Sequence, residues 1–113
     1  MSTSPDSDST AWTAVGTRDQ VEPDSPLAAS VDGTALGVYD VDGELHAIED
    51  ICPHAMAHLT QGFTDGCEVE CPLHNAVFDV TTGRHLRGEP CRDVKTFPVR
   101  LVGTRIEVCV NAA

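Results

Sequence analysis

The sequence predicts an all-β domain, built as a small antiparallel sheet sandwich or a partly open barrel. Short runs of apolar and β-branched residues are separated by turn dipeptides such as Asp32-Gly33 and Asp42-Gly43, a pattern typical of β-hairpins. No segment combines helical periodicity with the length of a main helix. With 113 residues, the chain has the size of one domain that buries one modest core.

The N-terminal half contains a polar tail followed by a three-stranded meander. Residues 1–10 are rich in Ser, Thr and Asp, so we expect a disordered N-terminal tail and a folded domain over residues 11–113. The two Asp-Gly turns join the runs on either side of them into antiparallel neighbours. Strands are therefore expected at 27–31, 34–39 and 44–49.

The C-terminal half is expected to hold four further strands, with Gly83 and Gly103 marking turns. Pro98 has no amide hydrogen to donate and indicates an edge position. In the last run Cys109 falls with the polar residues of an alternating pattern, so we expect its side chain to be partly exposed. The expected strands are 69–70, 77–79, 96–101 and 105–110.

Two short islands carry metal-ligating chemistry, Cys-Pro-His at 52–54 and Cys-Pro-Leu-His at 71–74. Each pairs one thiolate with one imidazole, and sixteen residues lie between the two islands. Two sulfur and two nitrogen ligands suit a Rieske [2Fe–2S] centre, in which two histidines replace two cysteines on one iron. Each loop can offer its cysteine inward and its histidine outward. We therefore assign Cys52 and Cys71 to one iron and His54 and His74 to the other, a pattern that favours electron transfer.

A single zinc ion held by the same four side chains is the alternative, because two cysteines and two histidines also form a common structural zinc set. Structural zinc loops usually pair like with like, whereas each island here mixes the two residue types. A regrouped zinc set stays open, since Cys67 and Cys71 are spaced C-x₃-C and His54 and His58 are spaced H-x₃-H.

Residues 49–110 resemble the Rieske-type ferredoxins of bacterial multicomponent aromatic-ring-hydroxylating oxygenases, most closely in the segment ECPLHNAVFDVTTG at 70–83. The resemblance implies a Rieske-like antiparallel β-sandwich with a cluster-binding subdomain at about residues 49–92. It implies one [2Fe–2S] cluster as the cofactor. The residues that match the family's ligand motif are Cys52, His54, Cys71 and His74.

The resemblance also implies partners. Such ferredoxins take electrons from a flavin-containing, NADH-dependent reductase and pass them to a terminal oxygenase, which selects the aromatic substrate. A carrier of this kind makes no chemical bonds and is not an enzyme. The alternative in the same family is a small Rieske subunit bound tightly within a nitrite-reductase-like enzyme.

The resemblance further implies a low reduction potential, because hydroxyl groups found in high-potential relatives are missing. Those relatives carry a serine and a tyrosine that donate hydrogen bonds near the cluster, and the matching positions here are Ala76 and Phe78. Such donors raise the potential by stabilising the added electron. We expect a midpoint of about −150 mV, at the lower end of the Rieske range.

The charge is strongly acidic and unevenly spread. The formal net charge is −11, and residues 1–83 contain fifteen acidic residues and one arginine, whereas residues 84–113 contain three acidic and six basic residues. We therefore do not expect this protein to bind nucleic acid.

The sequence shows no bilayer-length apolar run and no secretion signal, and five cysteines, an odd count, suit a reducing cytosol. We expect a cytoplasmic monomer that does not bind membranes.

Overall fold

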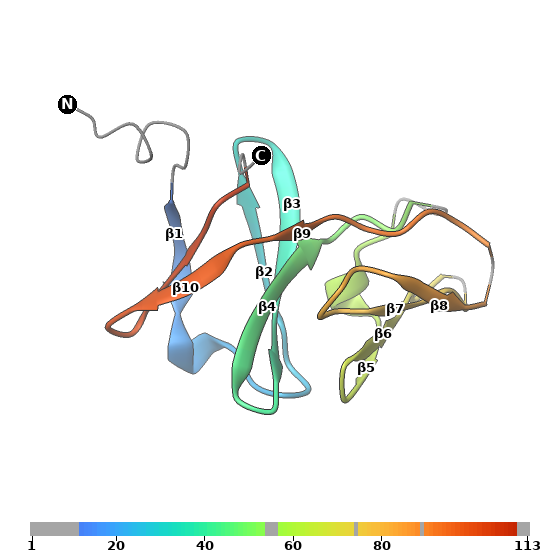
Figure 1. The fold of residues 1–113 in the computed structure, drawn as a ribbon, viewed down its shortest axis with the longest axis horizontal. Coiled ribbons are helices and arrows are strands. Elements are labelled where there is room, and N and C mark those ends of the chain that lie inside the picture. The colour runs from blue at the N-terminus through green and yellow to red at the C-terminus, as the bar shows by residue number, and fades with distance from the viewer. Residues whose placement is uncertain (1–11, 54–56, 74, 89, 111–113) are drawn as a thin grey trace.

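The computed structural model describes residues 12–53, 57–73, 75–88 and 90–110 (Figure 1). The expected disordered tail at 1–10 lies outside these residues. Antiparallel strands dominate the described chain, which confirms the all-β prediction. Its two helical segments are single 3₁₀ turns, η1 (Arg18–Gln20) and η2 (Leu59–Gln61). No helix in the described part is long and apolar enough to cross a membrane.

The described strands form three antiparallel sheets. The first sheet has the order β1-β11-β10, with β1 (Thr13–Thr17), β10 (Val99–Val102) and β11 (Arg105–Val108). The second has the order β2-β3-β4-β9, with β2 (Leu27–Val31), β3 (Thr34–Val41), β4 (Glu44–Glu49) and β9 (Thr96–Phe97). The third has the order β5-β6-β7-β8, with β5 (Phe63–Asp65), β6 (Glu68–Glu70), β7 (Val77–Asp79) and β8 (His85–Arg87).

The two Asp-Gly hairpins form as the sequence predicts. Val31 pairs with Thr34, and Val41 pairs with Glu44, so each turn contains two residues. Asp32 and Asp42 have φ values of 51° and 54°, and each is followed by a glycine that also has positive φ. Two-residue turns of this kind match the right-handed twist of the strands that they join.

The hairpin formed by β3 and β4 is buried on both faces and is the central layer of the molecule. Side chains alternate along a strand, so neighbouring residues enter different cores. Val38 and Ala47 pack in a core with Ile106 and Val108 of β11. Tyr39 and Ile48 point the other way. They pack in a second core, whose members from the third sheet and the loops include Leu59, Val69, Phe78, Val80 and Val94.

Figure 1 shows the consequence, with the first sheet at one side of the β3–β4 hairpin and the third sheet at the other. The first two sheets form the sandwich. The third sheet, together with the segments on either side of it, forms the opposite end of the molecule.

Two sequence predictions about the C-terminal strands were wrong in part. The run at 96–101 is two strands rather than one, because Pro98 separates β9 at the edge of the second sheet from β10 at the edge of the first. Cys109 is fully buried, since it directly follows β11, the middle strand of its sheet. The strands β1, β5 and β8 were not predicted, and β5 and β8 have three residues each.

We expect Leu36→Ala in β3 to lower the free energy of unfolding by roughly 2–5 kcal/mol, because Leu36 is fully buried in the sandwich core. The matched control is Leu101→Ala, since Leu101 is 47% exposed and should cost less than about 1 kcal/mol. Urea titration of both variants measures the difference. Equal losses would contradict the placement of Leu36 in the core.

We expect stability to decrease at low pH partly through Asp40 of β3. The hydrogen bond from the Arg18 side chain, at 2.7 Å, and then that from the Gly43 amide hold the pKa of this buried carboxyl below its ordinary value of 3.8. Its contribution is therefore present above about pH 4 and is lost as pH falls through the lower folded-state pKa. In Arg18→Met this acid-dependent part should shrink, as measured by urea titrations from pH 7 to pH 3. The control is Arg84→Met, because Arg84 forms no ion pair in the described chain. This control should keep the acid-dependent loss of stability.

Candidate metal centre

Cys52 and Cys71 lie on two loops that face the same core. Cys52 follows β4, Cys71 follows β6, and both are essentially buried, with 0% and 1% of their surfaces exposed. They belong to one buried cluster of side chains, so the fold brings together the two predicted cysteine ligands. The two predicted histidine ligands, His54 and His74, lie outside the described residues.

The two loops are closed in the same way. The amide of Cys52 donates to the carbonyl of Ala57 at 2.7 Å, and the amide of Cys71 donates to the carbonyl of Ala76 at 2.9 Å. In both cases the donor and the acceptor are five positions apart, and the cysteine is the first residue of the closed loop. Two islands with different sequences therefore become two loops with equivalent hydrogen bonding.

The base of the first loop depends on Asp50, a residue that the sequence analysis missed. This carboxylate is 1% exposed and accepts hydrogen bonds from the amide of Thr60 at 2.7 Å and from its hydroxyl at 2.9 Å. The ring of His58 lies 3.0 Å from the same carboxylate. Main-chain bonds add to the closure, since the Leu59 amide donates to the Asp50 carbonyl. Asp50 therefore joins the start of the loop to its end.

The second loop has a different base. It is carried by the ladder between β6 and β7, in which Glu70 pairs with Val77 directly below the loop. The first loop has only an isolated bridge between Ile51 and His58 at the corresponding place. The buried carboxylate of Asp50 thus fastens a loop that has no continuous ladder.

The side chains at positions 76 and 78, where high-potential relatives have hydroxyl groups, are apolar in this protein. Ala76 and Phe78 are fully buried in the cluster that contains both cysteines, and neither has a polar side-chain atom. Among the described residues of that buried cluster, Tyr39 is the only tyrosine, and there is no serine. Burial, with the neighbouring Asp50 carboxylate, raises the pKa of Tyr39 far above its ordinary value. This hydroxyl has no hydrogen-bond partner in the described residues.

A third segment, the chain between β8 and β9, packs against the second loop. Gly88 has a φ of 90°, a conformation that side chains rarely adopt. A Cβ atom at this position would overlap the carbonyl oxygen of Asn75 and lie 2.9 Å from the Cα of Ala76. Glycine is required here because the two backbones touch.

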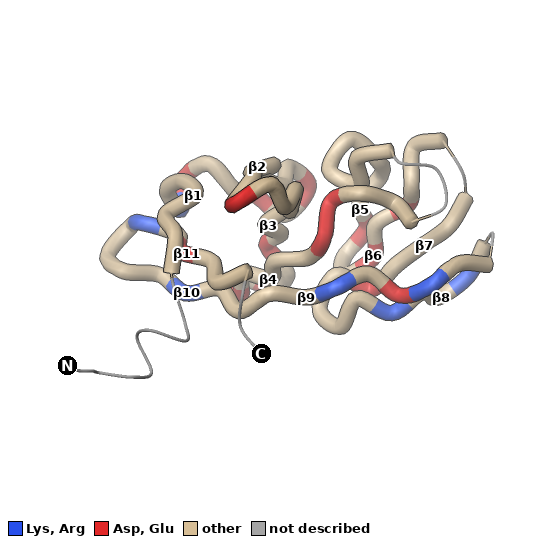
Figure 2. Tube along the Cα trace, turned by 90° about the horizontal axis from the view of Figure 1, so that it is seen from above, with Lys and Arg blue, Asp and Glu red and all other residues tan. Residues whose placement is uncertain are grey.

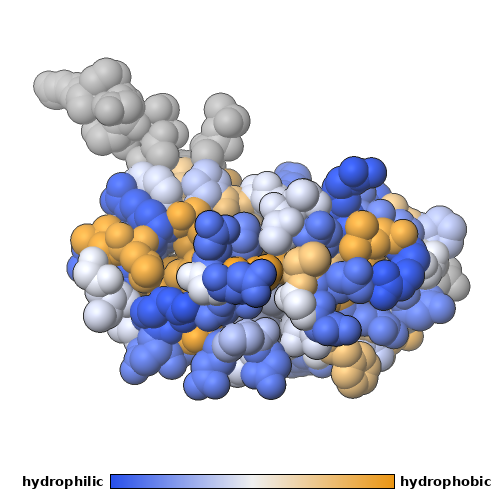
Figure 3. All heavy atoms as spheres, turned by 60° about the horizontal axis from the view of Figure 1, so that its bottom comes forward, coloured by the Kyte–Doolittle hydropathy of each residue, from blue (hydrophilic) through white to orange (hydrophobic). Residues whose placement is uncertain are grey.

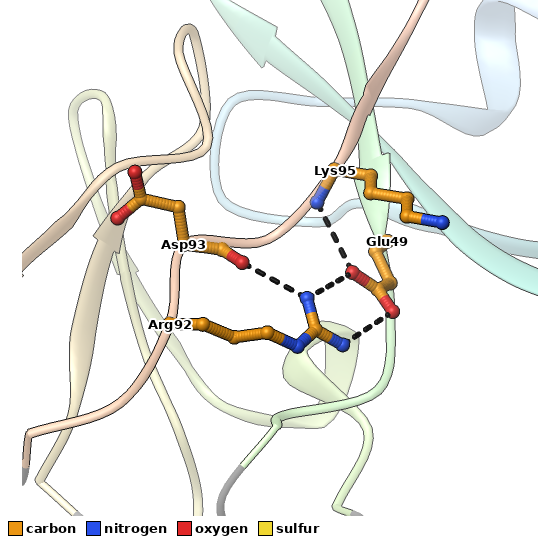
Figure 4. Close-up of polar contacts among 4 residues, drawn as sticks. All are labelled: Glu49, Arg92, Asp93 and Lys95. Atoms are coloured by element: carbon orange, nitrogen blue, oxygen red, sulfur yellow. Dashed lines mark hydrogen bonds and ion pairs between the residues drawn. The ribbon is translucent and has the colours of Figure 1, made fainter.

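The same segment is held at its other end by an ion pair (Figure 4). The guanidinium of Arg92 donates two hydrogen bonds of 3.1 Å to the carboxylate of Glu49, one to each oxygen. The amide of Lys95 adds a third donor at 3.1 Å. Burial acts to raise the pKa of Glu49, but the bonds from Arg92 and Lys95 outweigh it and hold this pKa below its ordinary value of 4.5.

The three remaining histidines of the chain have other surroundings. His46 lies 3.7 Å from Glu44, His58 contacts Asp50, and the ring of His85 packs edge-on against Phe78. The predicted basic character of residues 84–113 is visible along the chain from β8 to β9, whereas most acidic positions lie elsewhere (Figure 2). In the described part of the chain, no three His, Cys, Asp or Glu side chains gather as a metal site.

The donor set nevertheless fits an iron–sulfur cluster. Two buried cysteines on equivalently closed loops share one apolar surrounding, as thiolate ligands of a cluster require. An all-β domain with such a pair of loops at one end defines a small iron–sulfur protein.

Comparison with known proteins agrees with this class. Residues 11–98 match the Rieske [2Fe-2S] domain. The ferredoxin component of a naphthalene 1,2-dioxygenase system from Pseudomonas aeruginosa is 42% identical over 82 residues, which are 73% of this chain and 79% of that protein. The ferredoxin of carbazole 1,9a-dioxygenase from Nocardioides aromaticivorans IC177 is 38% identical, with a TM-score of 0.79 over 86% of this chain and 95% of its own.

Two further solved structures are similar to this chain. A ferredoxin chain in a complex of reduced oxygenase and oxidized ferredoxin in carbazole 1,9a-dioxygenase has a TM-score of 0.82 and 30% identity, over 90% of this chain and 95% of its own. A putative NADH-dependent nitrite reductase small subunit from Mycobacterium tuberculosis has a TM-score of 0.79 and 25% identity, over 92% of this chain and 98% of its own.

The chain belongs to the Rieske [2Fe-2S] family. Its cofactor is one Rieske-type [2Fe–2S] cluster, and its role is electron transfer rather than catalysis. This membership replaces the zinc alternative that the sequence left open.

We expect Asp50→Ala to lower the free energy of unfolding by roughly 2–4 kcal/mol, because it leaves the amide and hydroxyl of Thr60 without their buried acceptor. The control is Asp79→Ala. Asp79 also accepts two bonds from one threonine, Thr81, but is more exposed and should cost about 1 kcal/mol. Urea titrations of both variants make the comparison. A smaller loss for Asp50→Ala than for Asp79→Ala would contradict the role given to Asp50.

Proposed function

We propose that this protein is a low-potential Rieske ferredoxin that carries single electrons to a terminal aromatic-ring-hydroxylating oxygenase from an NADH-dependent flavoprotein reductase. We further propose Cys52, His54, Cys71 and His74 as the cluster ligands, within a cluster-binding subdomain at about residues 49–92. The observation that carries the ligand proposal is the matched closure of the two cysteine loops. By sequence, each loop encloses one of the histidines.

The ligand types explain what such a cluster does. Neutral imidazoles in place of two thiolates remove two negative charges from the irons, so an electron is accepted more readily than by an all-cysteine cluster. The apolar side chains of Ala76 and Phe78 work in the opposite direction, because they give no hydrogen bond to sulfur. Together these features support a potential near the lower end of the Rieske range.

The oxygenase and the reductase are proposed from the relatives and from the surface. The relatives named above are ferredoxins of dioxygenase systems, and one of them is seen in complex with its oxygenase. The face shown in Figure 3 is largely hydrophilic, with separate apolar patches. Leu73, next to the proposed ligand His74, is 69% exposed. A single exposed apolar side chain gives a small contact area, which suits brief binding. The net negative charge can steer the protein toward basic patches on its redox partners.

We also propose that the carrier is a cytoplasmic monomer. A second function keeps specific support, since the nitrite reductase small subunit named above has the same fold over almost its whole length. A subunit of that kind would co-purify with a large enzyme in fixed proportion. A diffusing ferredoxin would be isolated alone.

The first test is electron paramagnetic resonance of the purified protein before and after reduction with dithionite, with iron, sulfide and zinc measured on the same sample. We expect equal amounts of iron and sulfide, no signal when oxidised and a Rieske-type signal when reduced. Redox titration should give a midpoint of about −150 mV. Zinc without sulfide, or a midpoint above about +100 mV, would contradict the proposal.

We expect Leu73→Gln to slow electron transfer to the oxygenase several-fold and to leave the midpoint potential unchanged, because it removes the exposed apolar contact beside the proposed ligand His74. Stopped-flow measurement of the second-order rate constant at fixed ionic strength checks this. Leu101→Gln is the matched control, since Leu101 is also exposed but lies on β10, at the other end of the molecule (Figure 1). Equal slowing in both variants would remove Leu73 from the docking surface.

A further inference from the structure

The chain between β8 and β9 contacts both of the regions that carry the proposed ligands. At its start, Gly88 packs directly on the backbone of Asn75 and Ala76 in the second loop. Further along, Arg92 binds Glu49, the last residue of β4, which lies three residues before Cys52. The segment is therefore fixed at two points, by steric contact with the second loop at Gly88 and by an ion pair with the end of β4 at Arg92.

Neighbouring residues of this segment bind different sheets. Asp93 accepts a hydrogen bond of 2.8 Å from the amide of His85 in β8, which belongs to the third sheet. Arg92, one residue earlier, binds the second sheet through Glu49. The Glu49–Arg92 pair joins positions 43 residues apart. It is therefore a tertiary connection between the end of β4 and the segment that packs on the second loop.

The geometry is that of a specific pair rather than a loose surface contact. The guanidinium and carboxylate meet through two parallel bonds, and Arg92 donates a further bond of 2.9 Å to the carbonyl of Asp93. The Glu49 side chain is only 18% exposed, although that of Arg92 is 56% exposed. Bidentate pairs of this kind carry more geometric specificity than single contacts.

Displacement of the segment would open the core that holds the cysteines. Cys91, directly before Arg92, packs against the buried cluster that contains Cys52 and Cys71. If Arg92 no longer binds Glu49, the residue next to Cys91 is no longer held in place. Water can then reach the apolar surrounding of the two ligand cysteines more easily.

We propose that Glu49 and Arg92 are positioning residues that hold the chain around Cys91 and Arg92 against the core of the ligand cysteines and limit access of water to the cluster. The inference rests on the proposed ligand set. The Glu49–Arg92 pair should slow loss of iron and help to set the potential, since solvent exposure is one of the quantities on which the potential of such clusters depends.

The test compares Arg92→Met with Arg87→Met in the full-length protein that holds its cluster. Arg87→Met removes the same charge from the same stretch, but the Arg87–Glu68 pair, at 2.7 Å, joins two strands of the third sheet only. The rate of iron release to a ferrous chelator is followed by the loss of visible absorbance in reduced samples. We expect release about fivefold faster in Arg92→Met, which corresponds to about 1 kcal/mol, and less than about twofold faster in Arg87→Met.

The midpoint potential gives a second readout, measured on variants that retain the positive charge. Arg92→Lys keeps the positive charge but cannot form the bidentate pair. Added water favours the reduced, more negatively charged state, so we expect an upward shift in the midpoint of Arg92→Lys and none in Arg87→Lys. Glu49→Gln should accelerate iron release in the same direction as Arg92→Met, and it replaces that variant if Arg92→Met does not fold.

Equal release rates in the Arg92 and Arg87 variants, with equal potentials, would overturn this role of the Glu49–Arg92 pair. Unmodified protein that takes up no iron and sulfide would instead show that the proposed function has failed. The two failures are therefore distinct.

Discussion

The structure depends on one hairpin that is buried on both faces. Strands β3 and β4 give alternate side chains to two cores, one shared with the β1-β11-β10 sheet and the other with the sheet and loops that hold the cysteines. Val38 and Tyr39, adjacent in sequence, enter different cores. This arrangement places the loop after β4, with Cys52, at the edge of a rigid central layer. A cysteine held in this way, the proposed ligand Cys52, suits an electron carrier, because little atomic rearrangement then accompanies the change in charge.

The two cysteine loops reach the same hydrogen-bond closure by different means. The second loop sits on the ladder between β6 and β7, so the sheet itself holds its base. The first loop follows a single long strand and relies on the carboxylate of Asp50, which receives bonds from Thr60 across the base. The third segment then contacts the second loop through Gly88 and the end of β4 through Arg92. Polar interactions therefore fasten the loop whose two ends are not joined by a continuous ladder.

Local signals in the sequence predicted the elements whose structure is determined locally. Asp32-Gly33 and Asp42-Gly43 predicted both hairpins of the second sheet, since two-residue turns with positive φ need these residue types. The spacing of cysteine and histidine predicted the kind of cluster, because ligand type and number decide the chemistry. The resemblance to a family added the oxygenase and the reductase, which stay proposals.

Features that depend on distant residues were not predictable. No local signal marked the strands β5 and β8, and Cys109 follows a polar pattern yet is buried because it adjoins a middle strand. Asp50 and Arg92 read as ordinary charged residues. Their roles depend on Thr60 and Glu49, which only the folded chain brings into contact with them.

We expect the β3–β4 hairpin to couple the sandwich and the cluster end into one cooperative unit, because it gives side chains to both cores. An anaerobic urea titration followed by two probes tests it most directly. The fluorescence of Trp12, which lies against Arg100 of the first sheet, reports the sandwich, and the visible circular dichroism of the cluster reports the other end. We expect the two transitions to coincide. Loss of the cluster signal at clearly lower urea, with the Trp12 signal intact, would contradict it.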